Sequence, residues 1–149
     1  MALISTTVSL RAPNGQWWRI EKNTRVSATA PTLEKAEKFN LIPVPSDSSG
    51  KIINYALFST SLKKYLSRIS HPGKDYIEAA KDVIDPYSQF LMDPFQPSRD
   101  PNSIWSLLQA DNQLFLQVDS TDLSVRPIGE YSSNPANAHT MESLIAWLD

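Results

Sequence analysis

Apolar residues recur along the chain in three copies of one arrangement. Each copy opens with a short segment of the pattern apolar-x-Leu, at residues 8–10, 55–57 and 105–107. A polar turn follows, and the next segment begins with an aromatic residue beside a large apolar one: Trp17 and Trp18, Tyr65 and Leu66, Phe115 and Leu116. The leucines recur after 47 and 50 residues. This spacing indicates one supersecondary unit used three times.

Two further strands complete each copy. The third strand is expected at residues 26–28, 76–79 and 123–125, and the fourth at residues 39–44 and 90–92. In the last copy the fourth strand is sought near residues 143–148, which could equally form a terminal helix, and the repeat favours a strand. Within the chain, residues 32–38 have a composition that favours a short helix. Prolines and polar residues interrupt the pattern elsewhere, as is typical of all-β proteins.

Twelve short strands in three units avoid exposed edges by closing on themselves, which predicts a β-trefoil with pseudo-threefold symmetry. We expect one domain over residues 1–149, with repeats at about 7–50, 51–101 and 102–149. The side chains predicted to face inward are Leu10, Trp18, Ile20, Leu57, Leu66, Leu107, Leu116 and Val118. Arg68 occupies the position that matches Ile20 and Val118, so either the register shifts or, as we favour, its guanidinium reaches water at the barrel mouth.

Composition and charge narrow the classes of function. The net charge is −2, which gives no electrostatic footprint for nucleic acid. The chain has no cysteine, so disulfides, thiolate metal sites and cysteine nucleophiles are excluded. No apolar run is long enough for a membrane span. The first ten residues lack a signal-peptide pattern, and no Asn-x-Ser/Thr acceptor occurs, so a cytoplasmic or nucleocytoplasmic location is predicted.

Residues that could carry chemistry are scattered. His71 and His139 lie 68 residues apart without a spaced partner, and the prominent aspartates stand beside prolines or in turns. No catalytic residue, metal ligand or cofactor is therefore expected, and the sequence predicts that the chain is not an enzyme.

A family resemblance is carried by three stretches. They are Lys64-Tyr65-Leu66-Ser67-Arg68 with Ser70-His71-Pro72-Gly73, then Asp85-Pro86-Tyr87-Ser88-Gln89-Phe90, then Trp105-Ser106-Leu107-Leu108 with Asn112, Gln113 and Phe115. They resemble the amaranthin family of plant agglutinins over residues 7–148. The resemblance implies a β-trefoil lectin for galactose or N-acetylgalactosamine, as in the T-antigen disaccharide, and it allows a homodimer.

The resemblance also implies a sugar site in the loop after the hairpin of the second repeat. Where the family carries Ser-Pro-Asn and a His-Tyr-Trp run, this chain has Ser70-His71-Pro72 and then Gly73-Lys74-Asp75-Tyr76. Ser70, Pro72 and Tyr76 match the family pattern, whereas the Asn and the His-Tyr pair have no counterpart.

The residue types support two candidate sugar sites. A saccharide site combines a flat aromatic face with hydrogen-bonding groups, which Tyr76 supplies together with Asp75, Lys74 and His71, beside Ser70 and Arg68. An ordinary polar hairpin loop would have the same composition. Trp17 is the second candidate, because the alternation that turns Trp18 inward turns Trp17 outward, where it either binds a ligand or covers a small apolar patch.

The function predicted from the sequence is carbohydrate binding, with glycans or glycoproteins as partners. The alternative is a trefoil that binds protein without sugar, either as a protease inhibitor or as a fascin-like actin-binding module. The proline-rich segments at residues 42–49 and 93–101 would suit the inhibitor as preorganised loops.

Overall fold

The computed structural model describes residues 6–12, 14–45, 53–97, 103–112, 114–129 and 141–146, which form twelve strands and two short 3₁₀ helices. The strands are β1 (Thr6–Arg11), β2 (Trp17–Ile20), β3 (Val26–Ala30), β4 (Phe39–Pro45), β5 (Ile53–Ser59), β6 (Lys64–His71), β7 (Lys74–Lys81), β8 (Leu91–Pro97), β9 (Ser103–Gln109), β10 (Phe115–Val118), β11 (Val125–Gly129) and β12 (Met141–Ala146). The 3₁₀ helices are η1 (Leu33–Lys35) and η2 (Pro86–Ser88).

Six of the strands close a barrel. β1 pairs with β4 and β12, β4 pairs with β5, and β9 pairs with β8 and β12, all antiparallel. The ring closes between β5 and the residue before β8, where Tyr55 and Phe90 exchange two backbone hydrogen bonds of 2.8 Å. Each repeat thus contributes its first and fourth strands to the barrel, which leaves no open edge between the repeats.

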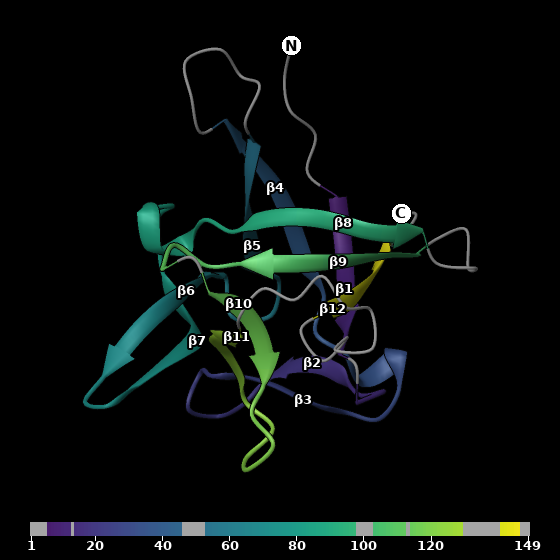
Figure 1. Cartoon of the computed structure of the whole chain (residues 1–149), viewed down its shortest axis with the longest axis horizontal. Helices are drawn as coiled ribbons and strands as arrows, with labels where there is room; N and C mark the ends of the chain where they lie inside the picture. Colours follow the sequence, from purple (N-terminus) through teal and green to yellow (C-terminus); the bar gives the residue numbers. More distant parts are fainter. Residues whose placement is uncertain are drawn as a thin grey trace.

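The remaining strands form three hairpins, β2–β3, β6–β7 and β10–β11. In Figure 1 they gather on the lower side of the molecule, and the β6–β7 hairpin extends outward at the lower left. Their second strands contact one another around the pseudo-threefold axis.

Equivalent hydrogen bonds join the hairpins at this axis. The amide of Ala28 donates to the carbonyl of Leu123, and the amide of Ala79 donates to that of Thr24, both at 2.9 Å. The third equivalent position is Pro127, which has no N–H to donate. There the Nε of Arg126 donates to the carbonyl of Asp75, again at 2.9 Å. The predicted threefold β-trefoil is confirmed, with a side chain completing its third junction.

The barrel interior holds the predicted core. Leu10, Trp18, Leu57, Leu66 and Leu116 are fully buried, and Phe39 and Phe90 join them. Ile20 and Val118 are partly buried against this cluster. The side chain of Leu107 lies outside the part of the chain described. Each fully buried large side chain stabilises the fold by about 1.5–3 kcal/mol. Burial of this cluster therefore offsets much of the conformational entropy that the chain loses on folding.

The structure corrects two expectations about local structure. The helical segment expected at residues 32–38 forms only the single turn η1. The described parts of the proline-rich segments are strands rather than loops, because Pro43 and Pro45 lie in β4, and Pro94 and Pro97 lie in β8.

Pro43 fits in β4 because its partner in β5, Tyr55, directs its N–H and C=O toward Phe90, so the pairing of Pro43 with Tyr55 needs no hydrogen bond from the missing N–H.

Two predictions concern the ends of the repeats. The strand predicted near residues 143–148 is present as β12, which pairs with both β1 and β9. The predicted repeat boundaries near residues 50 and 101 lie outside the described residues.

Candidate ligand-binding pockets beside η2

The predicted sugar loop is a tight hairpin turn. β6 runs to His71 and β7 begins at Lys74, so Pro72 and Gly73 alone connect them. Gly73 has φ of 80°, a conformation that favours glycine. Ser70 therefore pairs with Asp75, and His71 with Lys74, across an extended ladder.

Strand alternation divides the predicted site residues between two faces of this hairpin. The Arg68 guanidinium donates to Ser70 and Asp75, so these three side chains share one face. His71 and Tyr76 lie on the other face, where their rings meet edge to face with centres 5.6 Å apart. Lys74 is exposed beside the turn. The hairpin therefore does not bring all the predicted residues to one place.

Tyr76 is buried and offers no open face. Its side chain is 7% exposed, with the Arg25 guanidinium 3.7 Å above the ring centre and the Arg126 guanidinium 5.2 Å from it. The expectation of an exposed Tyr76 platform is corrected by these two arginines, which come from the neighbouring repeats.

His71 has a partner that the sequence did not indicate. Its Nε2 hydrogen bonds with the carboxylate of Glu78 at 2.6 Å, and Glu78 also accepts from the hydroxyl of Thr24. His71 thus belongs to the junction between the first and second repeats.

Trp17 is also buried, at 8% exposed, so the prediction that it faces outward is wrong. A register shift between Trp17 and Trp18 interrupts the alternation. Trp18 joins the core cluster, whereas Trp17 is buried outside it, with the Arg11 guanidinium 5.8 Å from the centre of its ring. The same shift occurs between Tyr65 and Leu66 and between Phe115 and Leu116.

Arg68 neither shifts the register nor extends into water. Its side chain is 16% exposed, and its Nε and Nη2 donate to the two carboxylate oxygens of Asp111 at 2.7 and 2.8 Å. Nη1 donates to Asp75 at 3.1 Å. The hydrogen bonds and charge of Asp111, followed by those of Asp75, raise the pKa of Arg68 against the opposing effect of burial. Because Asp111 belongs to the third repeat, this ion pair ties two repeats together.

Beside Arg68 lies a pocket of about 340 Å³, which we call the arginine pocket. Its lining residues are Arg68, Ile69, Ser70, Lys81 and Tyr87. Tyr87 is 48% exposed, with the Arg68 guanidinium 5.4 Å and the Lys81 ammonium 5.9 Å from the centre of its ring. Tyr87 is thus an accessible aromatic face with cations at its side.

Tyr87 is held in place by the capped helix η2. The Asp85 carboxylate accepts from the amides of Tyr87 and Ser88, and the Ser88 hydroxyl accepts from the Asp85 amide. Pro86 follows the cap, where its missing N–H costs nothing. Burial opposes ionisation of Asp85, but the hydrogen bond and charge of Lys81, together with these cap bonds, lower its pKa.

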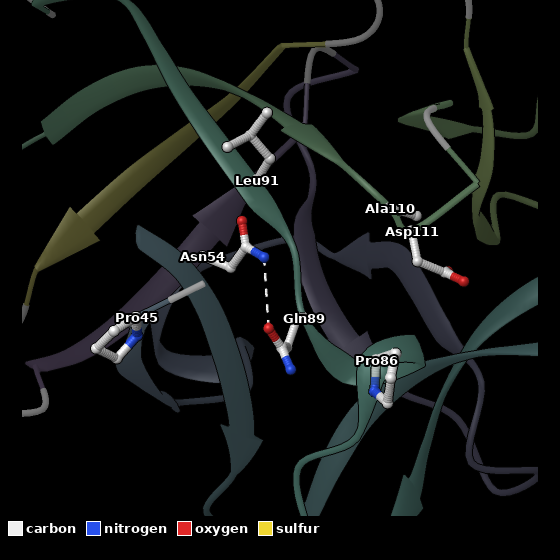
Figure 2. Close-up of a pocket in the computed structure, with 7 residues that line it drawn as sticks. All are labelled: Pro45, Asn54, Pro86, Gln89, Leu91, Ala110 and Asp111. Atoms are coloured by element: carbon white, nitrogen blue, oxygen red, sulfur yellow. Dashed lines mark hydrogen bonds between the residues drawn. The ribbon is translucent and has the colours of Figure 1, made fainter. Parts of the chain in front are cut away.

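On the other side of η2 lies a second pocket of about 400 Å³, which we call the amide pocket. Its lining residues are Pro45, Asn54, Pro86, Gln89, Leu91, Ala110 and Asp111. Figure 2 shows the amides of Asn54 and Gln89 pointing toward one another between Pro45 and Pro86, joined by a hydrogen bond of 3.4 Å. The pocket thus combines amide and carboxylate groups with apolar walls.

The two pockets share their framework. η2 supplies Pro86 to the amide pocket and Tyr87 to the arginine pocket, and the Arg68–Asp111 ion pair has one residue in each. Arg68 and Ser70 are the predicted site residues that line them. The other polar lining residues were missed, although the run from Asp85 to Gln89 belongs to the family resemblance.

Two classes of feature are absent from the part of the chain that the structure describes. It contains no cluster of three or more side chains suited to hold a metal ion. Within the same residues, no helix has the length and apolar character needed to cross a membrane.

Comparison with known sequences yields no match. Neither a protein-family model nor a curated protein matches the chain, so the amaranthin assignment rests on the local resemblance alone.

Comparison of structures identifies the fold. Cry35Ab1 superimposes with a TM-score of 0.67 at 14% identity, covering 96% of this chain and 36% of its own. A GlcNAcα1-4Gal-releasing endo-β-galactosidase from Clostridium perfringens gives 0.67 at 17% identity, covering 96% of this chain and 33% of its own. This chain therefore spans about a third of the length of either protein.

The designed threefold-symmetric protein ThreeFoil gives a TM-score of 0.65 at 14% identity, over 93% of this chain and 97% of its own. The endo-β-galactosidase corrects the prediction that the chain is not an enzyme. A unit of this fold occurs within a glycosidase, so a missing catalytic motif excludes no enzyme. At these identities the likeness establishes the fold, and the chain is a β-trefoil.

Proposed function

We propose that this chain binds carbohydrate in the amide and arginine pockets, and that its ligands are galactose or N-acetylgalactosamine glycans such as the T-antigen disaccharide. The observation that carries the proposal is the arrangement of two amides and a carboxylate in a pocket of about 400 Å³, beside an exposed tyrosine. The identity of the sugar rests on the resemblance to the amaranthin family.

The amide pocket has the chemistry that sugar hydroxyls require. A hydroxyl both donates and accepts, and the amides of Asn54 and Gln89 can do the same, while the Asp111 carboxylate accepts. Pro45 and Leu91 offer apolar surface to the C–H groups of a pyranose ring. Such a combination of apolar walls and a few polar groups is typical of small-ligand sites.

Tyr87 supplies the exposed aromatic surface that the sequence analysis predicted at Tyr76. Roughly half of its side chain is open, and η2 fixes its backbone, so stacking a sugar ring on it costs little conformational entropy. Arg68 and Ser70 stand beside it as hydrogen-bonding groups.

The fold is compatible with this proposal, because a carbohydrate-active protein, the endo-β-galactosidase, contains it. Contacts of a glycan with His71, Lys74 or Asp75 stay predictions, whereas the buried rings of Tyr76 and Trp17 are no longer proposed as its platforms. The single domain over residues 1–149, the homodimer, and the cytoplasmic or nucleocytoplasmic location also stay predictions.

Isothermal titration with N-acetylgalactosamine, galactose and the T-antigen disaccharide tests the proposal. Asn54→Ala and Tyr87→Ala should each weaken binding roughly five- to tenfold, the equivalent of about 1–1.4 kcal/mol. Asn40→Ala is the matched control, because Asn40 lies in β4 away from both pockets. The proposal fails if none of the three sugars binds, or if both pocket variants bind as tightly as the control.

A further inference from the structure

The positive charges at the two pockets are already committed to the protein's own carboxylates. Arg68 holds Asp111 through two hydrogen bonds and Asp75 through a third, and it also donates to Ser70 at 3.3 Å. Four of its five N–H donors are therefore bound to partners from two repeats. A bidentate arginine pair of this kind is among the stronger polar contacts in proteins.

Lys81, the second cation that lines the pockets, is committed as well. Its ammonium lies 3.1 Å from the Asp85 carboxylate. Asp85 in turn caps η2, which positions Tyr87. An anion that drew Lys81 away would remove a partner from the residue that holds this helix.

The local balance of charge is negative. Arg68 and Lys81 face the three carboxylates of Asp75, Asp85 and Asp111, which leaves one negative charge in excess. An anionic ligand would meet repulsion, and it could form a bidentate pair with Arg68 only by displacing Asp111 and leaving that carboxylate without its partner.

From this balance we infer that the two pockets select uncharged glycans and reject their sulfated or sialylated forms. The inference rests on the proposed function and specifies which class of glycan the pockets accept. Neutral hydroxyls need no ion pair to break, because Asn54 and Gln89 can exchange their mutual bond for bonds to the ligand. The Asp111 carboxylate keeps acceptor capacity beyond its two bonds to Arg68.

Matched pairs of ligands test this selectivity by titration calorimetry. The pairs are N-acetylgalactosamine with its 6-sulfate, and lactose with 3′-sialyllactose. We expect the charged member of each pair to bind at least tenfold more weakly. The affinity for the neutral member should be the same in low and high salt, because no ion pair forms on binding.

Asp111→Asn should change the selectivity. The substitution removes the excess negative charge and frees the guanidinium of Arg68. The 6-sulfate should then bind at most threefold more weakly than N-acetylgalactosamine itself. Asp75→Asn, which also releases a bond to Arg68, should act in the same direction and serves if Asp111→Asn does not fold. Asp82→Asn is the control with the same change in net charge, because Asp82 pairs with Lys64 outside both pockets.

The outcomes separate the two proposals. If wild-type protein binds the charged and neutral members equally, or if the variants that release Arg68 leave the selectivity unchanged, the inference is overturned and carbohydrate binding stands. If neither member of either pair binds, the proposed function is overturned together with the inference.

Discussion

Arg126 completes the threefold junction of the hairpins, and its removal should cost the fold more than its position near the surface suggests. Arg126 and Asp119 are each 12% exposed, and they form an ion pair of 2.9 Å. Arg126→Ala would leave Asp119 without this partner and the carbonyl of Asp75 without its donor. Breaking a buried pair costs about 3–5 kcal/mol, and partial exposure reduces this, so we expect a loss of about 3 kcal/mol in the free energy of unfolding.

Urea unfolding of four proteins tests the reasoning. In the Arg126→Ala background, Pro127→Ala supplies the N–H that Ala28 and Ala79 have at the equivalent positions, and it should recover about 1 kcal/mol. In the wild-type background the Asp75 carbonyl already has a donor, so Pro127→Ala should destabilise by roughly 0.5 kcal/mol through the unfolded chain. The sign of the Pro127→Ala effect should therefore reverse between the backgrounds. If Pro127→Ala changed the stability in the same direction in both backgrounds, Arg126 would not be replacing the hydrogen bond of the missing amide.

Further predictions concern buried and charged residues elsewhere. Tyr76→Ala should lower the free energy of unfolding by about 3 kcal/mol in urea, since the ring is buried under two arginines; loss of glycan binding at unchanged stability would instead make it a ligand platform. Hydrogen bonds from Thr121, helped by Arg126, lower the pKa of Asp119 to about 2. The resulting stability is present above the unfolded pKa near ~3.9 and is lost as pH falls through 2, so acid titration should remove roughly 1–2 kcal/mol in wild type but not in Asp119→Asn. Asp85→Ala should cost about 1–2 kcal/mol by removing the cap of η2 and should weaken binding at Tyr87, whereas equal affinity would show that η2 does not position the ring. Trp18→Phe should change stability by less than about 1 kcal/mol, because the lost packing is offset by removing a buried indole N–H that has no partner within the described structure; a melt showing a loss of several kcal/mol would contradict this.

Local pattern was sufficient to predict the repeated part of the fold. The positions of Leu10, Leu57 and Leu107 predicted three units, and the alternation around Leu66 and Leu116 predicted which side chains enter the barrel. These features depend on neighbours two to ten residues away, where strand geometry fixes the direction of each side chain. The burial of Leu10, Leu57, Leu66 and Leu116 confirms these inward positions.

The same alternation failed where the ladder is irregular. A register shift lies beside Trp18, where Trp17 is buried against expectation, and no residue type in the segment marks that shift. Tyr76 was expected at an exposed loop, yet Arg25 and Arg126 cover it from repeats about 50 residues away in either direction. The error at Trp17 concerns an irregular ladder within one hairpin, and the error at Tyr76 concerns packing between repeats, which a local pattern does not contain.

What the sequence determined by itself was the threefold repetition of strands, because hydrophobic periodicity is written in consecutive residues. The tertiary structure alone decided the pockets, since Asn54, Tyr87 and Asp111 come from three separate segments that meet only when the barrel closes. It also decided the state of Arg68, an apparent outlier in its strand that becomes the link to Asp111. The physical reason is that burial direction follows from local backbone geometry, whereas charge pairing and cavity shape depend on which distant surfaces are brought together.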